Sequence, residues 1–194
     1  MKMKIVKYFL IIVVTEIIYS FSIPKVADGD KIYWSKSTKL TWDDFKEPVP
    51  NTQTSTVAYT NSGYGYKLSY NEDSATFVLD CYFDKTKSWV KKAQANDFIL
   101  KHEQGHFDIT YTNSLRLRKT LKEHKFTLQN INDDVKKIVN ASYDANFKEQ
   151  ELYDAETNHS IIKEKQEEWN KKIEKDINDL DIYSAKTIAV KLNK

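Results

Sequence analysis

The residues with the clearest chemical potential are two histidines and a glutamate in the pattern His-Glu-x-x-His, at positions 102, 103 and 106. Each residue of an α-helix turns about 100°, so His102 and His106 lie about 40° apart on one face, one turn from each other. Two such imidazoles can bind one metal ion, and zinc is expected because it accepts neutral nitrogen ligands and keeps a position open for water. Glu103 projects beside the ion, where a carboxylate can take a proton from bound water. The motif therefore predicts a hydrolytic zinc site with Glu103 as general base.

A catalytic zinc site needs a third protein ligand, and the local sequence limits where it can lie. Ile109 and Thr112 occupy the positions where the longer motif H-E-x-x-H-x-x-G-x-x-H requires glycine and histidine. Glu123 and His124 would lie about 25 Å or more along an unbroken helix from His106. The third ligand is therefore expected from a distant part of the chain.

The best candidates lie together between residues 153 and 159. We favour His159 as the third ligand, and Asp154 and Glu156 are the alternatives. If His159 binds the metal, Asp154 is expected to orient a zinc-bound histidine from behind. Tyr153 would donate a hydrogen bond to the oxyanion that forms during attack on an amide. Two further polar residues on the histidine face are expected to hydrogen-bond around the site: Thr110 and Asn113.

The elements that must position these residues change type near residue 88. Short alternating or β-rich runs bounded by turn signals precede it and predict antiparallel strands near 38–42, 54–60, 64–70 and 75–83. After it, the sequence predicts a long helix over about 90–124 with Ser88 as its N-cap, and then helices at about 130–147, 149–156 and 161–180. The tail from 181 onward is either a strand or frayed. We expect an α+β fold in which a small antiparallel sheet packs on the motif-bearing helix, with additional C-terminal helices.

Composition and the N-terminus bound the class of protein. Residues 1–22 combine early lysines with an apolar run and predict a signal peptide or N-terminal anchor, although Glu16 interrupts the run too early for a membrane span. Residues 23–194 are long enough for one domain. The 30 Lys and Arg nearly balance the 28 Asp and Glu, which gives no indication of nucleic-acid binding. Cys81 is the single cysteine, so the expected exported protein has no internal disulfide.

Taken together, these residues resemble a bacterial family of predicted secreted zinc-dependent proteases, known as domain of unknown function 922. The similarity extends over most of the chain after residue 22. It is carried by Leu40–Phe45, Ser88–Val90, His102–Asp108, Tyr153-Asp154-x-x-Thr157-x-His159 and Gln166-x-x-Trp169. The chain departs from the family pattern at Ser160 and Glu47, where glycine is usual. The resemblance implies a zincin-like site.

The sequence thus favours an exported zinc peptidase that cleaves a protein or peptide substrate and has no integral membrane domain beyond a possible N-terminal anchor. Two other functions stay open. One is a non-catalytic envelope protein that binds zinc structurally or binds a partner through its tyrosine-rich sheet. The other is a metal-dependent amidase that acts on cell-wall peptides.

Overall fold

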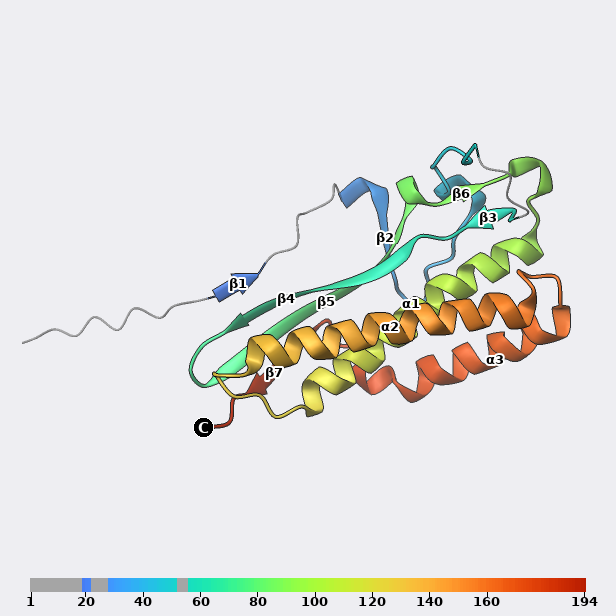
Figure 1. The fold of residues 1–194 in the computed structure, drawn as a ribbon. Helices are drawn as coiled ribbons and strands as arrows, with labels where there is room; N and C mark the ends of the chain where they lie inside the picture. The colour runs from blue at the N-terminus through green and yellow to red at the C-terminus, as the bar shows by residue number, and fades with distance from the viewer. Residues whose placement is uncertain (1–18, 22–27, 52–55) are drawn as a thin grey trace, which may run out of the picture.

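The computed structural model describes residues 19–21, 28–51 and 56–194. Within these ranges the chain is α+β, as expected, with antiparallel strands followed by three long helices (Figure 1). The predicted signal peptide or anchor lies outside the described residues except for 19–21, which form the short strand β1. In the described part of the chain, no helix combines the length and the apolar character that crossing a membrane would require.

The main sheet is built on a long hairpin formed by β4 (Ser62–Tyr70) and β5 (Ser74–Asp84). The strand β1 (Tyr19–Phe21) pairs with the far end of β4. On the other edge, β2 (Lys31–Tyr33) and β7 (Thr187–Lys191) pair with opposite ends of β5. All these pairings are antiparallel. The undecided C-terminal tail therefore contributes a strand that closes one edge of the hairpin.

Alternation along β5 shows which face of the sheet is buried. Ala75, Phe77, Leu79, Cys81 and Phe83 are buried, whereas the residues between them are partly exposed. This period of two is the pattern of a strand with one face on the core. The buried side chains pack with apolar residues of the first helix in a single cluster. The sheet thus supplies a fixed surface on which the motif-bearing helix rests.

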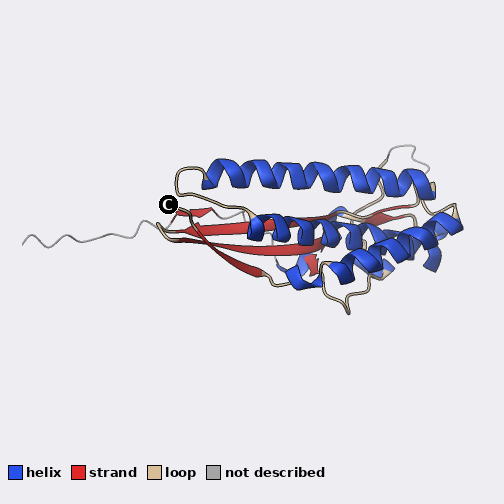
Figure 2. Cartoon of the chain, turned by 90° about the horizontal axis from the view of Figure 1, so that it is seen from below, coloured by secondary structure: helices blue, strands red, loops and turns tan. Residues whose placement is uncertain are grey.

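Three helices lie on this side of the sheet, and the last of them packs on the other two (Figures 1 and 2). They are α1 (Asp97–Glu123), α2 (Ile131–Thr157) and α3 (Lys163–Asp179). α1 contacts the sheet and both other helices, so it forms the centre of the molecule. The side chain of Asn96 caps α1 by accepting a hydrogen bond from the backbone NH of Ile99 (3.0 Å).

Three boundaries differ from the sequence-based expectation. Ser88 does not cap the long helix, because its hydroxyl donates to the carbonyl of Asp84 (2.7 Å) and Trp89–Val90 forms the strand β6. β6 pairs with β3 (Ala58–Tyr59) in a separate two-stranded sheet. The expected strand near 38–42 is absent from this described stretch, which is followed by a short 3-10 turn at Trp42–Asp44.

The largest difference concerns the break expected between two helical pieces near residue 148. The pieces predicted at 130–147 and 149–156 form one continuous helix, α2, which ends only at Thr157. Tyr153 and Asp154 therefore lie on a helix, and their side chains have fixed directions.

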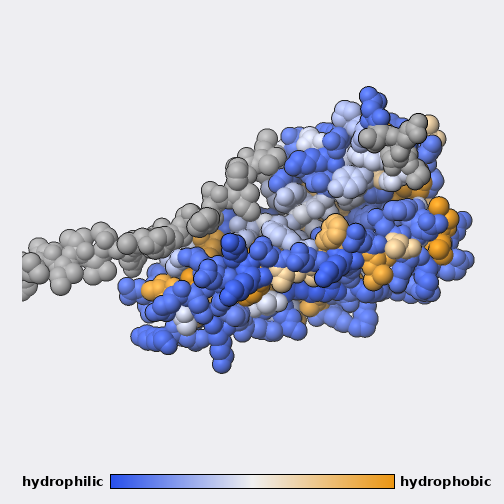
Figure 3. Space-filling model, in the orientation of Figure 1, coloured by the Kyte–Doolittle hydropathy of each residue, from blue (hydrophilic) through white to orange (hydrophobic). Residues whose placement is uncertain are grey.

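On the face shown in Figure 3, hydrophobic residues lie in small separated groups within a largely hydrophilic surface. The helices on this face present no broad apolar area to solvent.

Candidate metal centre

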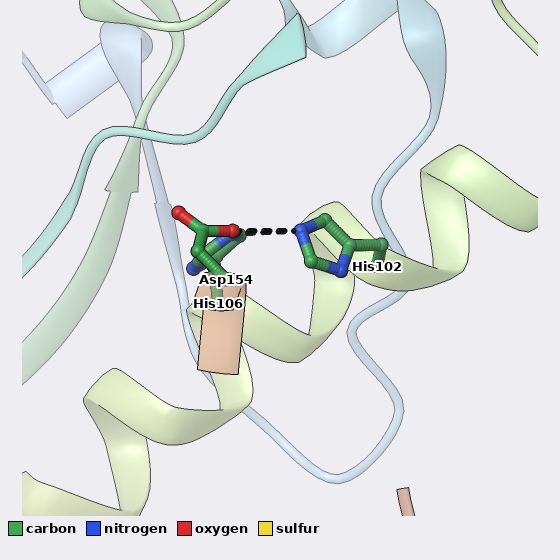
Figure 4. Close-up of side chains that lie close together, drawn as sticks. All are labelled: His102, His106 and Asp154. Carbon is green, nitrogen blue, oxygen red and sulfur yellow. Dashed lines mark hydrogen bonds and ion pairs between the residues drawn. The ribbon is translucent and has the colours of Figure 1, made fainter. Parts of the chain in front are cut away.

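The two motif histidines meet one carboxylate from the second helix. His102 and His106 project from α1 with their Nε2 atoms 3.1 Å apart. Asp154 Oδ1 lies 3.1 Å from each of these nitrogens. The side chains of His102 and Asp154 meet in Figure 4, with His106 behind them. These three residues form a group of donor atoms that could hold a metal ion.

The spacing of the three donor atoms fits a small divalent ion. Zinc binds histidine nitrogens and carboxylate oxygens at about 2.0–2.2 Å, so two donors on a tetrahedral zinc ion lie about 3.3 Å apart. The three separations observed here are all 3.1 Å. Adjustments of a few tenths of an ångström would bring the set to ideal spacing. Two histidines and one carboxylate are also a donor set that catalytic zinc sites use.

Hydrogen bonds fix which nitrogen of His102 carries a proton. His102 Nδ1 lies 2.8 Å from Gln166 Oε1. The Gln166 amide cannot be reversed, because its Nε2 donates to the hydroxyl of Tyr153 and to Asn170 Oδ1. The oxygen of Gln166 therefore accepts from His102 Nδ1–H. In the neutral ring this leaves the Nε2 lone pair facing His106 and Asp154.

His106 is held in the same way by a second glutamine. Its Nδ1 lies 2.6 Å from Gln150 Oε1. The Nε2 of Gln150 donates to the carbonyl of His106 (2.9 Å) and to Thr110 Oγ1 (3.0 Å), which fixes the orientation of this amide. Both imidazoles thus donate from Nδ1 and present Nε2 to the cluster. Hydrogen bonds of this kind from the far ring nitrogen are typical of metal-binding histidines.

The resulting cluster attracts positive charge. Two nitrogen lone pairs and a carboxylate oxygen converge, and such acceptors repel one another unless a cation or proton lies between them. Burial alone would raise the pKa of Asp154, but hydrogen bonds from His102 and His106 outweigh it and hold that pKa well below its usual range. Burial likewise opposes protonation of His106, yet the hydrogen bond to Asp154 and the charge of Glu103 raise its pKa. The site therefore stabilises a cation.

Glu103 lies beside this cluster and is buried, with 4 % of its surface exposed. Its Oε2 accepts a hydrogen bond from the hydroxyl of Thr60, which follows β3, at 2.7 Å. The hydroxyl also lies 3.3 Å from the backbone carbonyl of Glu103. The small sheet thus fixes one oxygen of the carboxylate that the sequence assigns as general base.

Gly105 explains how the histidines are held from below. A Cβ at this position would lie 2.3 Å from the hydroxyl oxygen of Tyr153 and 2.9 Å from its Cζ. The Tyr153 ring stacks on the His102 ring with centroids 4.5 Å apart, and its hydroxyl donates to the His102 carbonyl (3.2 Å). The absence of a side chain at Gly105 therefore makes room for the phenol of Tyr153.

The position of Tyr153 does not suit its expected role as an oxyanion donor. The side chain is fully buried, and its hydroxyl hydrogen is already donated to the carbonyl of His102. Burial also raises the pKa of this hydroxyl. Tyr153 therefore supports the ring of His102, and its hydroxyl hydrogen is not available to an oxyanion.

His159 lies next to the cluster but is not part of the three-residue donor group. Its Nδ1 is 3.2 Å from Asp154 Oδ1, and 59 % of its side chain is exposed. It sits in the middle of a left-handed turn in which Asn158, His159 and Ser160 all have positive φ values of 48°, 51° and 74°. Residues other than glycine adopt this backbone conformation at an energetic cost, and such strain concentrates at functional sites. The turn ends α2 and keeps His159 beside Asp154.

Other predicted residues have definite places around the centre. Thr110 accepts a hydrogen bond from Gln150, the residue that orients His106. Asn113 lies on α1 about one turn after Thr110, and its amide donates to Oε2 of Glu149 on α2 (2.8 Å). Glu156, one of the alternative third ligands, accepts a hydrogen bond at Oε2 from the indole NH of Trp169 (2.7 Å) and is not part of the three-residue donor group.

Sequence reasoning missed the two glutamines that orient the histidines. Gln150 precedes Asp154 by four residues, so the two share a face of α2. The sequence contains this spacing, but the break predicted near residue 148 concealed that both residues belong to one helix. Gln166 was noted only as part of the pattern with Trp169. Its full burial on a highly charged helix is a feature that only the structure reveals.

The fold and the site together define an α+β protein with a candidate metal centre on a His-Glu-x-x-His helix. The chain belongs to a family described as bacterial protein of unknown function (DUF922), whose model matches residues 44–160. This range contains both histidines, Glu103 and Asp154, and it ends before Gln166. No curated protein and no solved structure gives a significant match to the chain.

Proposed function

We propose that this protein is an exported zinc-dependent peptidase. The observation that carries the proposal is the convergence of three potential metal-ligating atoms, from His102, His106 and Asp154, each 3.1 Å from the other two. A glutamine behind each histidine supports this arrangement by fixing the proton on Nδ1. Three protein ligands with a further position open to solvent are typical of catalytic rather than structural zinc sites.

In the proposed reaction, water attacks the carbonyl carbon of a peptide bond and the carbon–nitrogen bond breaks. Zinc held by His102, His106 and Asp154 would supply a Lewis acid for this attack. Glu103 takes one proton from the attacking water and delivers it to the leaving amine. Burial and the hydrogen bond from Thr60 hold this carboxylate in one orientation. Tyr153 and the two glutamines act before the reaction, by fixing the imidazole rings.

The substitution Glu103→Gln tests the catalytic part of this proposal. The variant should bind about one equivalent of zinc, measured by plasma mass spectrometry, and lose hydrolysis of a peptide library by about 10²–10⁴-fold. Glu151→Gln is the matched control, because Glu151 lies exposed on α2 and should leave both properties unchanged. Full hydrolytic activity of Glu103→Gln would exclude Glu103 as the general base.

A structural zinc site is the competing function, and one observation favours it. His159 lies 3.2 Å from Asp154 on the exposed side of the cluster, where it could supply a fourth donor. A closed site with four protein ligands leaves no position for water. Replacing His159 with alanine separates the two functions: a structural site should lose much of its zinc affinity and all of its thermal response to zinc. A catalytic site should retain both.

A further inference from the structure

A hollow lies on a face of α1 that does not carry the metal-centre histidines. Its volume is about 370 Å³, which is within the range of small-molecule sites. Gln104 lines it and lies about 200° around α1 from His102. Ile173 and Ile177 of α3 also line it, and the loop after β2 provides the remaining wall. We refer to this space between α1, α3 and residues 34–39 as the rear groove.

A rigid aromatic side chain forms part of the loop wall. Trp34 stacks on Tyr111 of α1 with its ring plane tilted by only 9°. Its indole NH donates to Asp108 Oδ1 (2.8 Å), and the same oxygen accepts from Gln104 Nε2 (2.9 Å). These contacts hold the indole in place, and Trp34 also lines the groove. The groove is therefore lined by a rigidly held aromatic ring, that of Trp34, among polar side chains.

The charges of the groove favour neither an anion nor a cation. Both signs line it: Lys36, Lys39, Lys101, Asp108 and Glu174. Two of these lysines already form ion pairs, Lys36 with Asp181 and Lys101 with Glu167, each at 2.9 Å. An anionic ligand would approach the two carboxylates, and a cationic ligand would approach the lysines. A neutral ligand that hydrogen-bonds to groups of both signs avoids either repulsion.

Two amides extend the polar surface along α3. Asn170 and Asn178 both line the groove, and they are about 12 Å apart along the helix axis. The Asn178 amide has two donor hydrogens and an acceptor oxygen, so it can bind a hydroxyl in either role. Asn170 Oδ1 already accepts from Gln166 Nε2 (3.0 Å) and one Nδ2 hydrogen is directed at Glu167 Oε1 (3.4 Å), which leaves one Nδ2 hydrogen for a ligand. Ile173 and Ile177 lie between them and also line the groove; Ile173 is 5 % exposed, so most of the apolar surface here comes from the half-buried Ile177. The groove is thus elongated, with hydrogen-bonding groups at its edges and apolar surface in its middle.

We propose that the rear groove binds a neutral saccharide of one or two pyranose rings. A pyranose has apolar C–H faces and a rim of hydroxyls, which matches the indole and isoleucine surfaces flanked by amides and carboxylates. The C–H face packs against Trp34, and the hydroxyls bind Glu174, Asn170 and Asn178. This binding needs neither zinc nor peptide hydrolysis, so it is independent of the function proposed above.

Calorimetry and saturation-transfer NMR on the full chain test this proposal with defined probes. The sugars are N-acetylglucosamine, its β-1,4-linked dimer and maltose, while dialanine and inorganic phosphate represent charged ligands. At least one sugar should bind saturably and receive saturation transfer on its ring protons. Absence of saturable binding by all three sugars would overturn the proposal. Preferential binding of dialanine or phosphate to the groove would overturn it as well.

Rim variants locate the binding. The double variant Glu174→Ala/Asn178→Ala changes two exposed residues, so it should fold normally, as circular dichroism will show. It should weaken sugar binding about tenfold or more, equivalent to at least about 1.4 kcal/mol. The matched control is Glu168→Ala, an exposed glutamate on another face of α3, which should change affinity by less than roughly twofold. Equal affinities for the double variant and the control would place the sugar elsewhere and refute the assignment.

Discussion

Replacement of Gly105 by alanine sets two physical effects against each other. Alanine is favoured over glycine in a helix interior by about 1 kcal/mol, so helix propensity alone predicts a more stable protein. The new Cβ, however, would lie 2.3 Å from the Tyr153 hydroxyl oxygen and 2.9 Å from Cζ. Real Cβ atoms do not approach other atoms so closely, so the phenol or the helix must move.

Tyr153 has little freedom to move. The side chain is fully buried, stacks on His102 and is hydrogen-bonded to Gln166 and to the His102 carbonyl. Overpacking of this kind costs about 1–3 kcal/mol and occasionally more, and the rigid neighbour places Gly105→Ala at the upper end. After the propensity gain, we expect a net loss of about 2 kcal/mol. In a protein of this size the melting temperature should fall by about 4–8 °C.

Thermal and urea unfolding of Gly105→Ala measure this loss, with Gly29→Ala as the matched control. A Cβ at Gly29 would meet no atom within 4 Å, so the control should lie close to the wild type. Because Tyr153 supports the His102 ring, Gly105→Ala should also weaken zinc binding. A Gly105→Ala protein as stable as the wild type, or more stable, would refute the reasoning.

Further predictions concern the metal centre and the contact between α2 and α3. Gln166→Leu should weaken zinc binding about 10–100-fold by removing the acceptor that orients His102, as calorimetry will show. Asp154→Ala should abolish stoichiometric zinc binding and His159→Ala should retain it; the reverse pattern would make His159 the third ligand. In wild type, zinc at 100 times its Kd should raise the free energy of unfolding by about 2.7 kcal/mol, whereas an unchanged melting temperature would show that the folded chain binds no zinc. Burial raises the pKa of Glu149, but Lys172 and other partners outweigh it and lower the pKa overall. Its stabilising effect is therefore present above the ordinary glutamate pKa and is lost as pH falls through the folded-state pKa. Glu149→Gln should be less stable than wild type at pH 7, by on the order of 1 kcal/mol, and urea unfolding should show this gap closing at low pH.

The sequence was sufficient to predict elements with strong periodicity. The alternation of β4 and β5 predicted the hairpin, and the spacing of His102 and His106 predicted the helix face that carries the candidate ligands. The α+β class followed from these patterns. Both signals are local, because a strand or helix repeats within a few residues and its buried face appears directly in the residue types.

The third member of the donor group depended on information that is not local. Asp154 and His159 were both visible as candidates, but their distances from His102 depend on how α2 packs against α1. The sequence also suggested a break near residue 148, although no proline or glycine occurs anywhere in α2. Without that break, Asp154 is fixed on a helix face beside Gln150. His159 follows the helix in a left-handed turn. Glycine and asparagine are the residues that usually indicate such a turn, so histidine and serine gave no signal of it.

The central claim is that His102, His106 and Asp154 hold one metal ion. The most direct test is an anomalous diffraction map, recorded at the zinc absorption edge, from crystals grown with one equivalent of zinc. We predict a single peak at about 2.0–2.2 Å from His102 Nε2, His106 Nε2 and Asp154 Oδ1. A peak that contacts none of these atoms, or zinc-saturated crystals without a peak between the two imidazoles, would contradict the account.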